Sequence, residues 1–303
     1  MGALVPVLFA LCAALCNAVA TVLQRRAALT VPRSDHLRAG LMLDLARRPV
    51  WLGGMLAVVA AAVSQAIALA TGALSVVQPL FVLELPLTLL VASLLFHQRL
   101  RRAAWTAVVC VVAGLGVALA TASPSGNRTH VPIDRWVPAA AVCGGVVAIL
   151  VVAAFRRPVG QVRAACLGGA TALCYSFTAA LMKTATHILD VDGLVGFLTA
   201  WQTYGFAVTG VGALFLLENT MQAGPLVASQ PVLTVGDALI SVVLGITLYD
   251  EHIRSGWWVL PELCGVALIV LGATALARTS LAQSLMASDT PGPATSEGVR
   301  GPL

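Results

Sequence analysis

The chain contains nine apolar runs, each about as long as an α-helix must be to cross a membrane. A hydrocarbon layer of about 30 Å requires about 20 apolar residues of helix. Backbone groups in lipid must be hydrogen-bonded within the structure, and these runs lack the alternation of barrel strands. We therefore predict an all-α, polytopic membrane helix bundle of about nine transmembrane helices. The predicted spans are 3–23, 51–71, 73–96, 104–122, 137–155, 164–183, 194–217, 222–248 and 258–277.

The composition supports a membrane protein. Of the 303 residues, 59% are hydrophobic and 10% are charged, whereas roughly 25% of an ordinary soluble domain is charged. Too few polar residues remain to cover a soluble fold of this length. The basic residues form short clusters between the apolar runs and no continuous basic face, which argues against a nucleic-acid partner and for the lipid bilayer.

The basic residues also predict the orientation of the chain. With the N-terminus outside, 14 of the 18 basic residues fall on the cytoplasmic side, as the positive-inside rule requires. The prediction is an N-out, C-in protein that crosses the cytoplasmic (inner) cell membrane many times. The last segment, 279–303, is too polar to bury and is predicted to be a disordered cytoplasmic tail.

The two halves of the chain resemble one another. At an offset of 152 residues, Gln78-Pro79 lies over Gln230-Pro231 and Trp105 over Trp257. Five spans separate equivalent helices, and because five is odd the second copy crosses the membrane in the opposite sense. We predict two inverted four-helix repeats joined by a linker helix. Their ranges are 1–122 for the first repeat, 123–160 for the linker with the fifth span, and 161–278 for the second repeat.

This architecture, with its two Gln-Pro helices, resembles the drug/metabolite transporter superfamily of EamA-like proteins. The resemblance covers residues 1 to about 278. It implies two inverted halves around a central substrate site. The nine predicted spans are one fewer than the ten usual in that superfamily. A nine-span branch of the superfamily resembles magnesium transporters, so the resemblance leaves the substrate class open.

Two acidic residues lie inside predicted spans, Glu84 in the third and Asp237 in the eighth. An ionised group at the bilayer centre costs roughly 2.5 to 3.5 kcal/mol and usually faces a bundle interior or a cavity. The two acids follow Pro79 and Pro231 at nearly equivalent places, so the inverted repeat would bring both toward the centre. Burial disfavours the ionised form of a carboxyl group, so either acid could carry a proton.

Other polar residues are predicted to line the same space. Gln230, Thr234, Asp237 and Ser241 share one helix face. The prolines, with no backbone N–H, are expected to act as hinges. Polar residues in membrane helices also commonly bond a neighbouring helix or their own backbone. The full set of predicted substrate- or proton-binding residues is Glu84, Asp237, Gln78, Gln230, Thr234, Ser241, Thr88, Gln202, Tyr175 and Asn17, and the hinges are Pro79, Pro86 and Pro231.

Lys183 ends the predicted sixth span, and we expect its long side chain to reach the membrane interface. An alternative is that Lys183 binds an anionic substrate. The sequence indicates no metal-binding cluster, no cofactor and no catalytic residues. It has no glycine loop of the kind that binds ATP phosphates.

These features favour a secondary active transporter that moves a small solute by alternating access, and proton-coupled efflux is one mechanism that fits them. A divalent-cation (magnesium) transporter is the first alternative, because carboxylates and free carbonyls bind Mg²⁺. A structural or receptor-like membrane protein is the second. An enzyme is not expected. Substrate identity, transport direction, oligomeric state and the absence of a tenth helix stay open.

Overall fold

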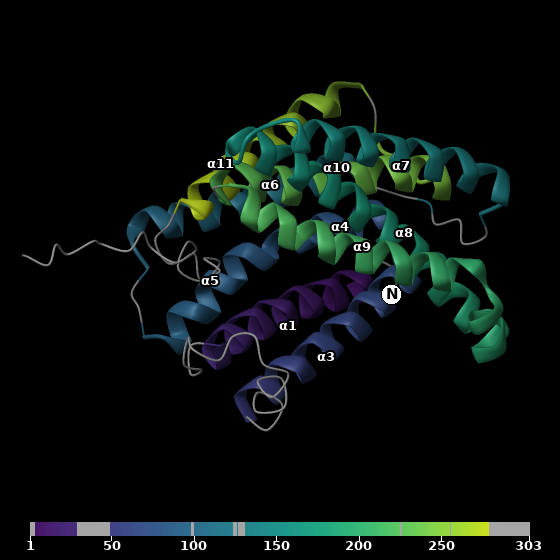
Figure 1. Ribbon diagram of the computed structural model, residues 1–303, viewed down its shortest axis with the longest axis horizontal. Coiled ribbons are helices and arrows are strands. Elements are labelled where there is room, and N and C mark those ends of the chain that lie inside the picture. The colour runs from purple at the N-terminus through teal and green to yellow at the C-terminus, as the bar shows by residue number, and fades with distance from the viewer. Residues whose placement is uncertain are drawn as a thin grey trace, which may run out of the picture.

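The computed structural model describes residues 4–28, 49–97, 100–123, 126, 131–224, 226–254 and 256–278. The predicted tail, 279–303, lies outside the described residues. All elements in the described part are helices (Figure 1). In chain order they are α1 (Leu4–Ala28), α3 (Pro49–Thr71), α4 (Leu74–Leu80), the 3₁₀ segment η2 (Phe81–Leu83), α5 (Glu84–Leu95), α6 (Arg102–Ala122), α7 (Ile133–Phe155), α8 (Gln161–Thr199), α9 (Trp201–Ala223), α10 (Leu226–Tyr249), the 3₁₀ segment η3 (Gly256–Trp258) and α11 (Val259–Ala277).

Eight helical segments in the described residues are long and apolar enough to cross a membrane. The prediction of an all-helical fold is therefore confirmed for the described residues, and these eight segments are compatible with a membrane bundle. The segments are α1, α3, α4 to α5, α6, α7, α8, α10 and η3 to α11. The region predicted as the seventh span forms α9, which has 23 residues and is not one of the eight. It carries Gln202, Glu218, Asn219 and Gln222, and these polar residues lower its hydropathy.

The boundary between the sixth and seventh predicted spans was wrong. Helix α8 does not end at Lys183; it runs from Gln161 to Thr199 and changes direction at Gly193, whose φ is +68°. Ala200 then adopts an extended conformation and separates α8 from α9. The residues that follow Lys183 are moderately polar but form helix readily, so hydropathy alone placed the end of this helix too early.

The helices pack in matched pairs in the two halves of the chain. In the first half α1 packs on α3 and on α4 and α5, and in the second half α8 packs on α9 and on α10. The last helix of each half, α6 and α11, packs against the other, and α4 packs against α10 (Figure 1). Two of the contacts between the halves therefore join elements at corresponding positions, and a further contact joins α3 to α8.

The contact between α6 and α11 is close because glycines lie in it. A Cβ atom on Gly114 would lie 2.6 Å from the carbonyl oxygen of Gly265, and a Cβ atom on Gly265 would lie 2.7 Å from that of Gly114. Backbones in membrane bundles approach in this way where side chains are small. The two helices thus touch backbone to backbone.

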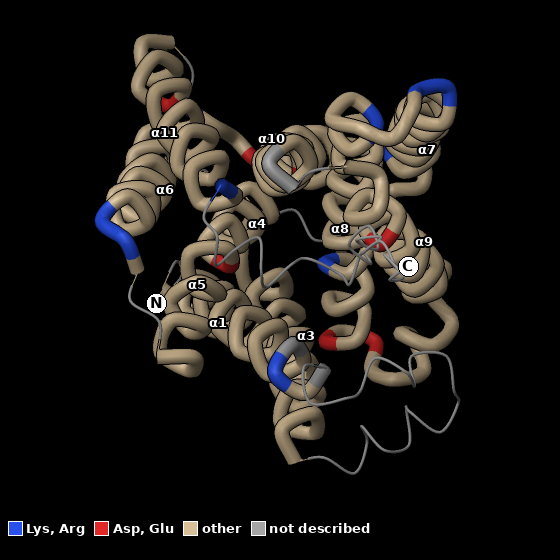
Figure 2. Tube along the Cα trace, turned by 60° about the vertical axis from the view of Figure 1, so that its left-hand side comes forward, with Lys and Arg blue, Asp and Glu red and all other residues tan. Residues whose placement is uncertain are grey.

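Apolar residues occupy both the interior and the outer surface. Trp136 is fully buried and makes edge-to-face contacts with Phe177 and Trp201 at ring-centroid distances of 5.8 and 5.5 Å. Helix α7 nevertheless exposes Val142 and Ile149 by about two thirds. Large apolar faces of this kind are expected toward lipid. The described basic residues lie mostly at helix ends (Figure 2), with Lys183 as the exception considered below.

Candidate functional site

The third membrane span is broken next to Glu84. Helix α4 ends at Leu80, three residues form the 3₁₀ turn η2, and α5 begins with Glu84. Pro79 has no N–H to donate, and the N–H of Phe81 bonds to the carbonyls of Gln78 and Pro79 instead of continuing a regular helix. Pro86 lies in the first turn of α5, where its missing N–H costs little. The prolines therefore explain the break, and they place Glu84 at a helix N-terminus, which favours a negative charge.

Glu84 contacts the first helix of the chain. The amide Nδ2 of Asn17 on α1 donates a hydrogen bond to Oε2 of Glu84 at 3.3 Å. The predicted site residue Thr88 lies one turn farther along, but its hydroxyl donates to the backbone carbonyl of Glu84 at 2.8 Å. The structure thus brings Asn17 to the carboxyl group and leaves Thr88 bonded to its own helix.

Asp237 contacts α8 in a similar way. The hydroxyl of Ser176 lies 2.7 Å from Oδ1 of Asp237 and also approaches the backbone carbonyls of Asp237 and Ala172. Ser241, one turn on from Asp237, is fully buried and lies near the same carboxyl group, although its hydroxyl makes no hydrogen bond of good geometry with a described residue. Asp237 and Ser241 therefore share a helix face, as predicted.

The two acids lie near one another. The carboxyl groups of Glu84 and Asp237 are close enough for the charge of one to affect the other, and the Tyr175 hydroxyl is close enough to be affected by both. Both acids are only partly buried. The ion pairs of the described residues include neither of them. The structure thus places one acid from each half in a common region, with Tyr175 nearby.

Ser176 is a site residue that the sequence analysis missed. The sequence analysis placed only Tyr175 of this helix at the site, and Ser176 is the next residue along the chain. The usable signal was the pair Ala172 and Ser176, small residues one turn apart. Helix α10 lies close there, since a Cβ on Gly236 would be 3.1 Å from the Cβ of Ala172, and this proximity allows a short serine to reach Asp237.

The remaining predicted residues are placed less directly. Gln78 is 3% exposed on α4. Thr234 donates to the backbone carbonyl of Gln230. Pro231 lies inside α10, which continues through it from Leu226 to Tyr249. Gln202 is in the first turn of α9, and none of the hydrogen bonds between described residues connects it to either acid.

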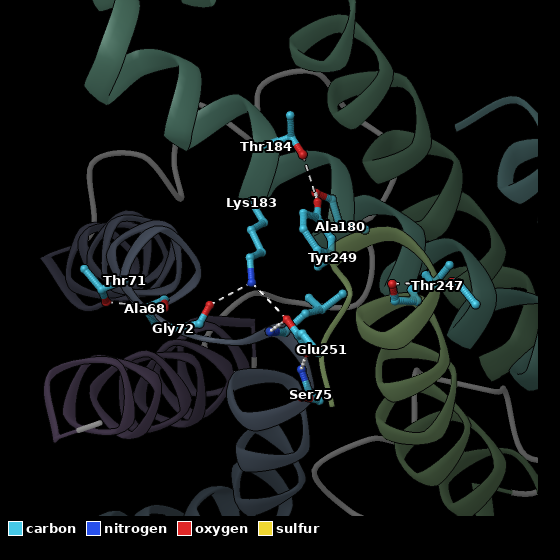
Figure 3. Close-up of polar contacts among 12 residues, drawn as sticks. Ala68, Thr71, Gly72, Ser75, Ala180, Lys183, Thr184, Thr247, Tyr249 and Glu251 are labelled. Atoms are coloured by element: carbon cyan, nitrogen blue, oxygen red, sulfur yellow. Dashed lines mark hydrogen bonds and ion pairs between the residues drawn. The ribbon is translucent and has the colours of Figure 1, made fainter. Parts of the chain in front are cut away.

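Lys183 does not reach the membrane interface, so that prediction was wrong. It is 2% exposed, and its ammonium group donates to Oε1 of Glu251 at 3.0 Å and to the carbonyl of Gly72 at 2.9 Å (Figure 3). It also lies 4.6 Å from the centre of the Tyr249 ring. The physical reason is that α8 continues for several turns beyond Lys183, which leaves the side chain inside the bundle. Glu251, which is 68 residues away in the sequence, neutralises the charge of Lys183.

Glu251 was also missed, because it lies between the eighth and ninth predicted spans and the search for site residues was confined to the spans. Its carboxylate accepts hydrogen bonds from the backbone N–H groups of Leu74 at 2.6 Å and Ser75 at 2.9 Å (Figure 3). The preceding residue, Asp250, has a φ of +50°, and the Glu251 N–H bonds to the carbonyl of Gly245. A residue in the left-handed conformation just after the last helical residue is a common way for a helix to end. Here it turns Glu251 back toward α4.

Comparisons with known proteins place the chain in a family. No family model matches the chain, and no solved structure matches it. An uncharacterized protein from Corynebacterium glutamicum is 32% identical over 285 residues, which cover 91% of this chain and 96% of that protein. The similarity therefore extends over nearly the whole of both chains. The chain belongs to the same protein family as this Corynebacterium glutamicum protein.

Proposed function

We propose that the protein is a secondary active transporter that moves a small solute across the cytoplasmic membrane by alternating access, with protons as the coupling ion. The observation that carries this proposal is the pair Glu84 and Asp237. Two acidic residues from different halves interact with one another inside an apolar bundle. Acids at such depth are costly, and a purely structural protein has no need for two of them side by side.

The environment of the pair supports a cationic solute. Asn17, Ser176 and Tyr175 supply neutral polar groups around the two carboxyl groups. Neither acid is in an ion pair with a described basic residue. A cation could therefore take the place of bound protons and neutralise the site, and this competition for the same carboxyl groups would exchange solute for protons.

The packing supports two inverted halves, as the repeats in the sequence suggest. Helices α1 and α8 hold corresponding places, each packed on the helix that follows it and on the helix that carries an acid. The contacts between α6 and α11 and between α4 and α10 join the halves through equivalent elements. We take α9 as a further span, which brings the number to nine, and we take the N-terminus as outside. This arrangement is similar to that of the drug/metabolite transporter superfamily. We propose no enzymatic activity.

Transport can be tested with the purified protein in liposomes that contain a pH-sensitive dye. A panel of organic cations, amino acids and MgCl₂ is added outside, and the proton movement that each solute evokes is recorded. We expect a response in the wild type and at least a tenfold smaller response in Glu84→Gln and in Asp237→Asn. Glu262→Gln is the matched control, because Glu262 lies in the first turn of α11 and not at the site.

A divalent-cation pathway is a second candidate, favoured by the same two carboxyl groups. Magnesium keeps several waters and needs only one or two protein carboxylates. Among the described residues no group of three or more His, Cys, Asp or Glu side chains gathers as a metal site, so any such pathway would hold a hydrated ion. Stabilisation by MgCl₂ that disappears in the double variant Glu84→Gln/Asp237→Asn would favour it over the organic-cation transporter.

A further inference from the structure

The residues around Lys183 tie the two halves of the chain together at one end of the bundle. The first half contributes Gly72, which precedes α4, and the first two residues of α4, Leu74 and Ser75. Lys183 on α8 and the end of α10 belong to the second half (Figure 3). We call this set the Lys183 cluster; its members are Gly72, Leu74, Ser75, Lys183, Tyr249 and Glu251.

The cluster is closed and its two charged groups are paired. The side chains of Lys183 and Glu251 are 3% and 0% exposed. Glu251 accepts three hydrogen bonds, from Lys183 and from two backbone N–H groups. The Tyr249 ring beneath the ammonium group is held by its hydroxyl, which bonds to the carbonyl of Ala180 and lies 2.8 Å from the hydroxyl of Thr184. The two charged side chains are therefore shielded from solvent.

The same helices lead from the cluster to the two acids. Along α4, Gln78 lies between the cluster and Glu84, and along α10, Ser241 lies between the cluster and Asp237. Gln78 is 3% exposed and Ser241 is 0% exposed, whereas Glu84 and Asp237 are each partly exposed. The two acids are therefore less enclosed than the residues that lie between them and the Lys183 cluster.

A buried ion pair is a poor choice if stability alone is needed. Replacing such a pair with apolar residues of similar volume is often neutral or stabilising, since burial costs both charges their hydration. An ion pair has a different advantage at a contact that must open. Once the end is hydrated, water solvates both charges, whereas an apolar plug would expose its surface to water at a cost.

We propose that the Lys183 cluster is a gate that closes one end of the transport pathway, and that Glu251 must leave the N-terminus of α4 for that end to open. This inference rests on the proposed transporter function, because a gate needs two-sided access. In the predicted orientation the gate faces outward, since α4 begins and α10 ends on that side. The structure is then the state in which the outer end is closed.

The test measures access to a position behind the gate and requires no substrate. Ser241→Cys is introduced into a chain whose seven native cysteines are replaced, and its reaction with a charged, membrane-impermeant maleimide is timed in intact cells. We expect slow labelling in this parent and labelling about tenfold faster with Glu251→Gln added. The double variant Lys183→Met/Glu251→Gln should behave in the same way, and since it leaves no unpaired charge it guards against misfolding.

Thr247→Val is the matched control. Thr247 lies near the end of α10 beside the cluster, but it is exposed and bonds only to carbonyls of its own helix (Figure 3). Its labelling rate should equal that of the parent. Inverted vesicles, which present the cytoplasmic side, should show no rise for any variant.

Two results would overturn the gate. One is an unchanged rate in both cluster variants when gel filtration shows intact protein. The other is a rise that is equal from both membrane sides, which would mean general loosening of the bundle. Neither result depends on a transport assay, so the two proposals fail separately. Transport with unchanged labelling would refute the gate alone, whereas one-sided opening in a protein that moves no solute would refute the transporter.

Discussion

Asn17 on α1 donates a hydrogen bond to Glu84 on α5 at 3.3 Å. In the second half Ser176 on α8 stands in the same relation to Asp237 on α10, at 2.7 Å. In each half, therefore, the first helix holds the acid that the third membrane segment of that half carries. The common pattern links the repeat in the sequence to the chemistry of the site.

We predict that Ser176→Ala weakens transport without unfolding the protein. A hydrogen bond to a charged group contributes about 1.5 to 3 kcal/mol, so the solute-evoked proton response should fall about ten- to one-hundredfold if the bond orients the Asp237 carboxyl group for binding. Liposome flux and the melting temperature are measured together. Thr199→Val is the control, because the Thr199 hydroxyl is exposed on α8 and bonds only to its own helix; equal losses in the two variants would contradict the prediction.

The Lys183–Glu251 pair should show strong coupling in a double-mutant cycle. Lys183→Met or Glu251→Gln alone leaves one buried polar partner uncompensated, at a cost of about 3–5 kcal/mol in the free energy of unfolding. The double variant should lose clearly less than the sum of the two single losses. Unfolding in detergent measures all three. Additive losses would show that the two side chains do not interact in the protein.

Gly114→Ala should destabilise the contact between α6 and α11. The added Cβ would lie 2.6 Å from a backbone carbonyl, which a side-chain rotation cannot relieve, and overpacking of this kind costs about 1–3 kcal/mol. Gly116→Ala is the matched control two residues away, since a Cβ there meets nothing within 4 Å. The melting temperatures of the two variants are compared. A drop in Gly116→Ala as large as that in Gly114→Ala would argue against this packing.

The predicted orientation can be tested at two exposed positions between helices. In the cysteine-free chain, Ser123→Cys after α6 should react with an impermeant maleimide added to intact cells. Val159→Cys, between α7 and α8, should react only in inverted vesicles. The opposite pattern would reverse the N-out orientation, and with it the side on which the proposed gate lies.

Much of the fold was predictable because hydropathy reports local burial in lipid. The helix break beside Glu84 was predictable from Pro79 and Pro86, whose chemistry acts on the backbone next to them. The proximity of Glu84 to Asp237 was predicted from the repeat, which carries information about contacts far apart in the chain. These inferences needed only local chemistry and symmetry.

The Lys183 cluster could not be predicted in this way. Lys183 and Glu251 are 68 residues apart, and Glu251 and Leu74 are 177 apart. A hydropathy analysis predicts that a lysine near the end of an apolar run extends to the aqueous interface. It takes no account of a carboxylate that lies far away in the sequence. The backbone turn at Asp250 decides where Glu251 points, and its φ of +50° is not apparent from the residue type.

The central claim is that Glu84 and Asp237 serve one site, and a double-variant comparison of liposome flux tests it most directly. Solute-evoked proton movement is measured for the wild type, Glu84→Gln, Asp237→Asn and the double variant, all at equal protein content. If both acids bind the same solute, each single variant loses most of the response and the double variant loses little more. A wild-type response in either single variant, or losses that multiply in the double variant, would contradict a shared site.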